Sequence, residues 1–161
     1  MEPTVVDLAS KVHDLLVERG ENVATAESLT GGRLASALTE APGASKSYLG
    51  GVVAYATSVK QEVLGVPATL VEQHGVISAE CALAMARGAV ALTGAVWGIG
   101  TTGVAGPDPQ EGHPPGTVHV GLVGPGVSTA LALELVGGRE AIQDRTCAEA
   151  LSALEGILSH R

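Results

Sequence analysis

The 161-residue sequence contains no phenylalanine, one tryptophan and two tyrosines, although 45% of its residues are hydrophobic. Because large aromatic side chains are so scarce, the core must consist of many small aliphatic side chains. The 22 glycines indicate sharp turns that lie close to other backbone segments. A chain of this length buries a substantial core without disulfides or structural metals. The composition therefore predicts a single globular domain over residues 1–161.

Basic residues are also scarce, with nine Lys and Arg against seventeen Asp and Glu, so that the formal net charge is −8. A nucleic-acid surface needs clustered Lys and Arg, and this balance argues against a nucleic-acid partner. A small phosphate ligand stays compatible with the charge, because helix ends and one or two arginines can form a local site in an acidic protein.

Long apolar runs and paired cysteines are absent as well. No run approaches the roughly 18 apolar residues that a membrane span requires, and charged residues interrupt the N-terminal apolar stretch, unlike a signal peptide. Cys81 and Cys147 are far apart, which favours buried reduced thiols over a disulfide. The five histidines lack paired metal-ligand spacing. We therefore expect a cytoplasmic protein without membrane contact, metal or cofactor, and a homodimer as the ordinary oligomeric state.

The spacing of hydrophobic residues predicts alternating helices and strands. A capping box of Thr4 and Asp7 begins the first helix and Gly20 ends it, while Gly124–Gly126 joins two late strands into a hairpin. This order predicts an α/β fold with three α/β/α layers and a mixed, mostly parallel five-stranded sheet containing one antiparallel strand. The expected helices cover about residues 5–16, 33–42, 59–64, 68–73, 79–90 and 147–158. The first three expected strands are buried and cover residues 23–26, 49–55 and 97–102. The two strands of the hairpin cover residues 118–123 and 129–136.

Three segments that carry chemistry follow the ends of predicted parallel strands. They contain Ser28, the pair Tyr55 and Lys60, and the small-residue loop 101–107. Ligands of open α/β sheets bind where loops leave the carboxyl ends of the strands. We therefore expect these segments to meet in one crevice.

Ser28 is the strongest candidate nucleophile, because the Gly31–Gly32 pair after it begins a helix and offers backbone N–H groups to an oxyanion. Lys60 is the candidate base if burial lowers its pKa from about 10.4 towards about 7. The Tyr55 hydroxyl is expected to relay a proton or to orient the lysine. The hypothesis is a serine–lysine hydrolase acting on a small anionic amide.

The residues alone leave simpler interpretations open. Ser28 and Thr30 also suit helix capping, and their pattern is not the G-x-S-x-G nucleophile elbow. Lys60 also suits a solvated surface position, and Tyr55 ordinary packing at a strand end. The loop 101–107 suits a phosphate or a flat ring held against backbone, but ordinary turns have a similar composition.

Four strings in this order resemble the CinA C-terminal domain family, whose characterised members are nicotinamide mononucleotide amidohydrolases, also called nicotinamide-nucleotide deamidases. The resemblance extends from about Leu8 to the last predicted helix. The strings are Thr25-Ala26-Glu27-Ser28-x-Thr30-Gly31-Gly32, Tyr55-(x4)-Lys60, Gly75-Val76-Ile77-Ser78 and Thr102-Gly103-Val104-Ala105-Gly106-Pro107.

The resemblance implies hydrolysis of the carboxamide of nicotinamide mononucleotide to nicotinate mononucleotide and ammonia, in pyridine nucleotide salvage. It also implies a sheet like that of anticodon-binding domains, with Ser28 as nucleophile, Lys60 as base and Tyr55 as the supporting hydroxyl. Many relatives carry an N-terminal pyrophosphatase-like domain, which does not occur in these 161 residues. The implied substrate-binding residues are Thr30, Gly31, Gly32, Thr102, Gly103, Ala105 and Gly106.

The chain departs from the family pattern at three places. Leu29 replaces a common cysteine beside the serine. In the family motif Gly-Asp-Arg-x-x-Ile-Arg, Gly138 replaces the aspartate and Gln143 the second arginine. Arg145, two residues further on, is the remaining candidate for substrate binding in this region. In the family pattern this region serves phosphate binding or a subunit contact, and the two replacements at Gly138 and Gln143 affect whichever of these it makes here.

Two other functions remain open at this level. A non-catalytic nucleotide-binding module would use the same crevice without chemistry. Pyrophosphate hydrolysis on a dinucleotide would ordinarily need a carboxylate cluster and a divalent metal, and no such cluster stands out in the sequence.

Overall fold

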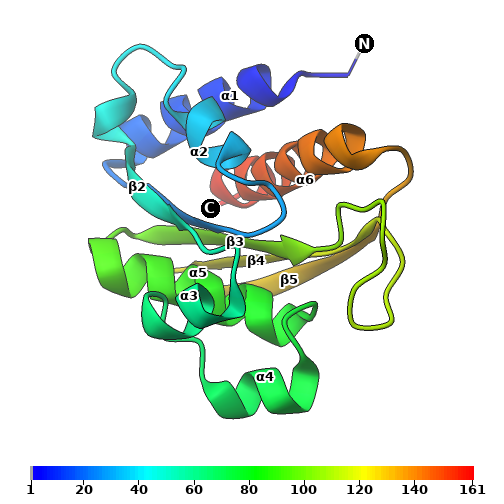
Figure 1. Cartoon of the computed structure of the whole chain (residues 1–161). Helices are drawn as coiled ribbons and strands as arrows, with labels where there is room; N and C mark the ends of the chain where they lie inside the picture. The colour runs from blue at the N-terminus through cyan, green and yellow to red at the C-terminus, as the bar shows by residue number, and fades with distance from the viewer. Residues whose placement is uncertain (1) are drawn as a thin grey trace.

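The computed structural model describes residues 2–161 and places five strands in the order β2-β1-β3-β4-β5. Figure 1 shows helices covering both faces of this sheet, so the predicted α/β architecture with three layers is observed. The strands are β1 (Val23–Glu27), β2 (Tyr48–Val53), β3 (Trp97–Gly103), β4 (Thr117–Gly124) and β5 (Val127–Glu134).

The sheet is mixed, but its pairings are evenly divided rather than mostly parallel. β1 pairs in parallel with β2 and β3, whereas β3–β4 and β4–β5 are antiparallel. The link from β3 to β4 contains no helix that could carry the chain across the sheet, so β4 returns beside β3 in the opposite direction. A tight turn then adds β5. β4 is therefore the one strand that runs against the other four.

Two helical layers enclose the sheet (Figure 1). Three helices cover one face and build the larger core with Leu16, Trp97 and Leu151. On the other face, the core consists mostly of small side chains from α5 and β1. The first layer contains α1 (Val5–Arg19), α2 (Arg33–Leu38) and α6 (Arg139–Ser159), and the second contains α3 (Thr57–Glu62), α4 (Ala68–His74) and α5 (Ala79–Thr93).

Helix boundaries follow local capping. Thr4 and Asp7 form the predicted capping box of α1, and Gly20 ends the helix in the left-handed conformation. Ser78 accepts a hydrogen bond from the backbone N–H of Cys81 and thereby begins α5. A short 3-10 helix, Ala44–Lys46, was not predicted, because three residues are too few for a periodic pattern.

Close approach between α5 and the sheet explains two strand glycines. A Cβ atom on Gly100 would lie 2.2 Å from the carbonyl oxygen of Ala82, and one on Gly121 would lie 2.6 Å from the same atom. The helix therefore lies nearly against the backbone of β3 and β4. This contact holds the middle of β3 against α5, and the loop over the candidate site departs from the carboxyl end of the same strand.

Strand β2 differs from its prediction as a buried strand. It forms an edge of the sheet, and its residues alternate between half-buried and exposed. Leu49 and Val53 are 44% and 49% exposed at this edge. Cys81 and Cys147 are free and buried, as predicted. Within residues 2–161, no helix combines the length and apolar character that a membrane crossing requires.

Candidate active site

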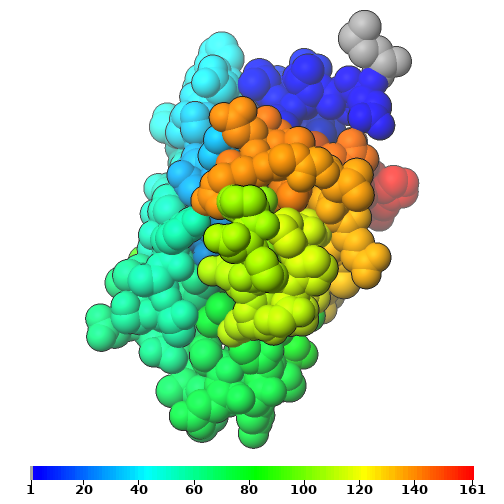
Figure 2. Space-filling view, turned by 45° about the vertical axis from the view of Figure 1, so that its right-hand side comes forward, coloured from blue at the N-terminus to red at the C-terminus, as the bar shows by residue number. Residues whose placement is uncertain are grey.

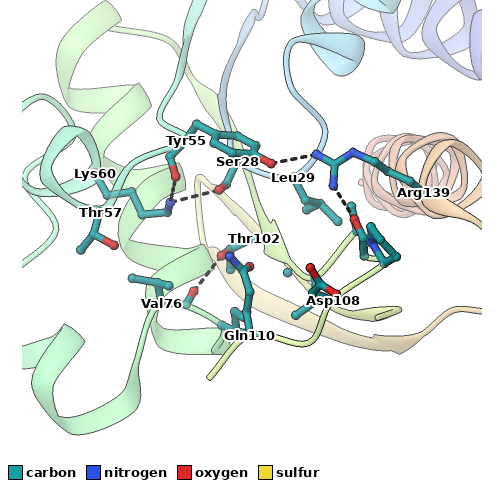
Figure 3. A pocket seen from close by; sticks show the side chains of 16 residues that line it. Ser28, Leu29, Tyr55, Thr57, Lys60, Val76, Thr102, Asp108, Gln110 and Arg139 are labelled. Atoms are coloured by element: carbon teal, nitrogen blue, oxygen red, sulfur yellow. Dashed lines mark hydrogen bonds between the residues drawn. The ribbon is translucent and has the colours of Figure 1, made fainter. Parts of the chain in front are cut away.

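The side chains of Ser28 and Lys60 meet at the end of β1. Ser28 follows the last residue of this strand, and Lys60 lies on α3, which begins shortly after β2. Because β1 and β2 are parallel neighbours, their carboxyl ends lie at the same edge of the sheet. The Nζ atom of Lys60 is 3.0 Å from the Oγ atom of Ser28 (Figure 3). The predicted pair is therefore within direct hydrogen-bond distance.

Two backbone carbonyls fix the position of the Lys60 amine. Nζ donates hydrogen bonds to the oxygens of Ala54 (2.8 Å) and Tyr55 (3.1 Å), and the side chain is only 2% exposed. A neutral amine has two N–H donors and one lone pair. The charged amine donates its third N–H to Ser28 Oγ; once it is deprotonated, with both remaining donors directed to the carbonyls, its lone pair faces the Ser28 hydroxyl. The arrangement therefore suits a lysine that accepts a proton from serine.

Burial lowers the pKa of Lys60, because removing the ammonium group from water disfavours its charged form. The nearby Cys81 and Glu111 side chains oppose this shift by favouring the cation. The net direction is the one that a general base requires, since only the neutral amine can take the serine proton.

The pair lines a pocket of about 230 Å³. The predicted crevice is therefore present, and all three segments expected to form it contribute. Figure 2 shows the yellow-green loop after β3 lying below the orange beginning of α6, with the blue-green chain around α3 beside it. The pocket lining includes Ser28, Leu29, Tyr55, Thr57, Lys60, Val76, Ile77, Thr102, Gly103, Val104, Ala105, Gly106, Pro107, Asp108, Gln110 and Arg139.

Arg139 joins two walls of the pocket. Its Nη2 atom donates to the hydroxyl of Tyr55 at 2.8 Å, and its Nη1 atom donates to the carbonyl of Gly106 at 2.6 Å (Figure 3). The Tyr55 side chain is 60% exposed, and its hydroxyl contacts Arg139 rather than Lys60. Tyr55 thus orients the lysine through its backbone carbonyl, which differs from the role expected for its hydroxyl.

The loop after β3 is anchored to the turn between α4 and α5. The carboxylate of Glu111 accepts hydrogen bonds from the backbone N–H groups of Val76 (3.1 Å) and Ile77 (2.9 Å). The Thr102 hydroxyl donates to the carbonyl of Val76 at 2.7 Å. These contacts fix the far wall of the pocket, to which Thr102, Val76 and Ile77 belong.

The glycine pair after Ser28 does not offer free donors. The N–H of Gly31 donates to the carbonyl of Ser28 at 3.1 Å, and the N–H of Gly32 donates to the Glu27 carboxylate at 3.2 Å. Glu27 also accepts from Leu34 and Ala35, so its buried carboxylate caps α2. Neither glycine lines the pocket. An oxyanion would therefore need other donors in this turn.

Thr30 and Arg145, two further predicted binding residues, also lie outside the pocket lining. Thr30 is fully buried, and its hydroxyl lies 2.8 Å from that of Thr101. Arg145 forms ion pairs with Glu2 at 3.2 Å and Glu149 at 2.9 Å. By contrast, Thr102, Gly103, Ala105 and Gly106 do line the pocket.

Three polar residues around the site were not predicted, although each lies in a segment that resembles a family motif. Glu27 immediately precedes the serine, and Arg139 and Gln143 occupy the motif at the start of α6. The sequence predicted substrate binding at Arg145, whereas the arginine that the motif retains, Arg139, is the one that lines the pocket. No group of three or more His, Cys, Asp or Glu side chains within residues 2–161 is arranged to hold a metal ion.

Comparison with known sequences identifies relatives of this domain. The family model of the CinA C-terminal domain matches residues 5–158. A CinA-like protein of Frankia casuarinae is 45% identical over 152 residues, which are 94% of this chain and 35% of that protein. A putative competence-damage inducible protein of Geobacillus kaustophilus is 49% identical over 140 residues, or 86% of this chain and 34% of its own length. The chain thus spans about a third of the length of these curated relatives.

Solved structures agree with this assignment. A CinA superfamily protein of Klebsiella pneumoniae superposes with a TM-score of 0.95 at 33% identity, covering 99% of this chain and 100% of that one. A competence/damage inducible protein of Agrobacterium tumefaciens gives a TM-score of 0.91 at 32% identity, covering 99% of each chain. Together, the family model, the sequence relatives and the shared fold show that this chain belongs to the CinA C-terminal domain family.

Proposed function

We propose that the pocket hydrolyses the carboxamide of nicotinamide mononucleotide, yielding nicotinate mononucleotide and ammonia. One observation carries the proposal: Lys60 Nζ lies 3.0 Å from Ser28 Oγ while two carbonyls accept its remaining N–H groups. A buried lysine whose pKa is lowered, beside a serine hydroxyl, is the arrangement that activates an alcohol for attack on an amide carbon. The family resemblance supplies the substrate.

The reaction proceeds in two halves. Lys60 takes the proton of the Ser28 hydroxyl as Oγ bonds to the carboxamide carbon, forming a tetrahedral intermediate. The carbon–nitrogen bond then breaks, and the lysine gives its proton to the departing nitrogen, which leaves as ammonia. Water next attacks the resulting ester while Lys60 takes a proton from it. The serine regains its proton from Lys60, and the acid that leaves gives up its remaining proton to solvent to become the carboxylate.

The rim of the pocket supports an anionic substrate. Arg139 is a permanent cation with five N–H donors, and its contacts with Tyr55 and Gly106 use one donor on each terminal nitrogen. The remaining donors are available to a phosphate. Ser28 and Lys60 line the same pocket as Arg139. Recognition of the phosphate would thus place the carboxamide at the nucleophile.

Ammonia release from nicotinamide mononucleotide tests this function. Purified protein is expected to convert the substrate to nicotinate mononucleotide and ammonia in equal amounts, as measured by a coupled ammonia assay and by NMR of the pyridine ring. A binding module would instead raise the melting temperature in the presence of the nucleotide and leave its concentration unchanged. That second result would disprove the enzymatic proposal.

A further inference from the structure

One carboxylate of the pocket has no part in the chemistry described above. Asp108 belongs to the loop after β3 and lines the same pocket as Ser28, Lys60 and Arg139 (Figure 3). Among residues 2–161, no cation or hydrogen-bond donor pairs with its side chain. A negative charge at a site for an anionic substrate opposes binding unless it contacts another part of the ligand.

The segment that carries Asp108 is anchored on both sides. Before it, the carbonyl of Gly106 accepts a hydrogen bond from Arg139 at 2.6 Å. After it, the Glu111 carboxylate accepts two backbone N–H groups from the turn before α5. A proline precedes the aspartate and another follows it, and proline fixes its own φ and favours an extended residue before it. The backbone at Asp108 is therefore held before the substrate arrives, which reduces the entropy lost on binding.

The order of groups in the substrate indicates what Asp108 contacts. In nicotinamide mononucleotide, the ribose joins the phosphate to the pyridine ring that carries the carboxamide. With the phosphate at Arg139 and the carboxamide at Ser28, the ribose lies next to the arginine. Asp108 is two residues from Gly106, to which Arg139 is hydrogen-bonded, so it belongs to the same end of the pocket. This places the aspartate beside the sugar.

A carboxylate suits the neighbouring 2′- and 3′-hydroxyls of a ribose. Each hydroxyl needs an acceptor for its proton, and the two oxygens of an ionised carboxylate accept both protons. Dinucleotide-binding folds use an acidic residue in this way on a ribose hydroxyl. Hydrogen bonds from the sugar would also offset the repulsion between Asp108 and the phosphate.

We propose that Asp108 is a specificity-determining residue whose carboxylate binds the ribose diol of the substrate and selects ribonucleotides over their 2′-deoxy counterparts. This inference rests on the proposed function, which places nicotinamide mononucleotide in the pocket. The sugar is remote from the bond that breaks, so its contact is the same in the ground state and the transition state. Loss of the contact therefore raises KM and leaves kcat nearly unchanged.

The direction of the change in KM separates this role from that of a solvated loop residue. Asp108→Asn keeps the shape of the side chain and removes its charge. If the carboxylate binds the diol, KM for nicotinamide mononucleotide should rise at least about tenfold, with kcat within about threefold. A carboxylate that only faces solvent would repel the phosphate, so its removal would lower KM.

Asp14→Asn is the matched control, because it removes the same charge at an exposed position of α1, outside the pocket lining. It should leave KM and kcat unchanged. Thermal melting would verify that both variants are folded. An unchanged or lower KM in folded Asp108→Asn would overturn the inference.

A second readout needs no catalysis. Isothermal titration calorimetry would compare ribose 5-phosphate with 2-deoxyribose 5-phosphate, which lacks one hydroxyl of the diol. The parent protein and Asp14→Asn should bind the ribose compound at least about tenfold more tightly, and Asp108→Asn should bind the two compounds alike.

Equal affinities in the parent, or no binding of either compound, would disprove the diol contact. If Asp108→Asn then still weakened nicotinamide mononucleotide, the carboxylate would pair with the pyridinium cation instead, and the inference would be wrong. A parent protein that distinguishes the two sugars but releases no ammonia would disprove only the proposed function.

Discussion

At the scale of single residues, the protonation of Lys60 governs the proposed chemistry. Burial lowers its pKa, and only the unprotonated amine accepts the Ser28 proton. The rate of ammonia release should therefore rise with pH, with a half-maximum below the ordinary lysine value of 10.5. Lys60→Arg should lose at least about 10³-fold in kcat and fail to recover at high pH, because arginine stays charged. A pH-independent rate, or an active Lys60→Arg variant, would exclude this base.

Arg139 offers a separate test of substrate recognition. Arg139→Gln removes the cation at the pocket rim and its bonds to Tyr55 and Gly106, so KM should rise at least about tenfold. Arg145→Gln is the matched control, because Arg145 lies outside the pocket and pairs with Glu2 and Glu149. Steady-state kinetics with nicotinamide mononucleotide would measure both. A larger rise in KM for Arg145→Gln would restore that residue to the binding site.

At the scale of secondary-structure elements, Glu27 connects β1 to α2. Its carboxylate accepts three backbone N–H groups at the start of this helix while staying only 1% exposed. Glu27→Ala leaves these donors without an acceptor and should lower the free energy of unfolding by about 1–3 kcal/mol. Glu40→Ala, at an exposed position just beyond the helix, should change it by less than about 0.5 kcal/mol.

Urea unfolding followed by circular dichroism would measure both variants. Equal stabilities would mean that the three hydrogen bonds contribute nothing to α2. Because Glu27 directly precedes Ser28, we also expect Glu27→Ala to lose activity together with stability.

The elements were largely predictable because their signals are local. The capping box and Gly20 define α1, and Ser78 defines the start of α5. The exposure of β2 was not predictable, because Leu49 and Val53 are apolar and only the strand order shows that β2 is an edge. The equal division of parallel and antiparallel pairs likewise depends on where β4 joins the sheet.

The candidate site was predictable where strand ends carry the chemistry, and not where distant elements return to it. Ser28 and Lys60 follow neighbouring parallel strands, so topology alone brings them close. Gln143 and Arg139 reach the site from α6, and no local pattern shows which α6 side chains face Leu29 or Tyr55. The sequence also does not show that the N–H groups of Gly31 and Gly32 already have acceptors. Glu27 is visible as an acidic residue, but only the structure shows that its carboxylate accepts the N–H of Gly32.

At the scale of the whole molecule, the small-residue core encloses both thiols. Burial raises the pKa of Cys81 to about 11 and that of Cys147 to about 12. The folded protein should therefore show no alkylation by iodoacetamide at pH 8 over an hour, and both cysteines should react in denaturant. Intact mass spectrometry would detect each added group. Rapid alkylation of the native protein would contradict the burial described for both cysteines.

The central claim is that Ser28, activated by Lys60, is the nucleophile of an amidase. The most direct measurement is the initial rate of ammonia release from nicotinamide mononucleotide by the parent protein and by folded Ser28→Ala, with exposed Ser36→Ala as the control. The account predicts a loss of at least about 10³-fold in Ser28→Ala and none in Ser36→Ala. Undiminished ammonia release by Ser28→Ala would contradict it.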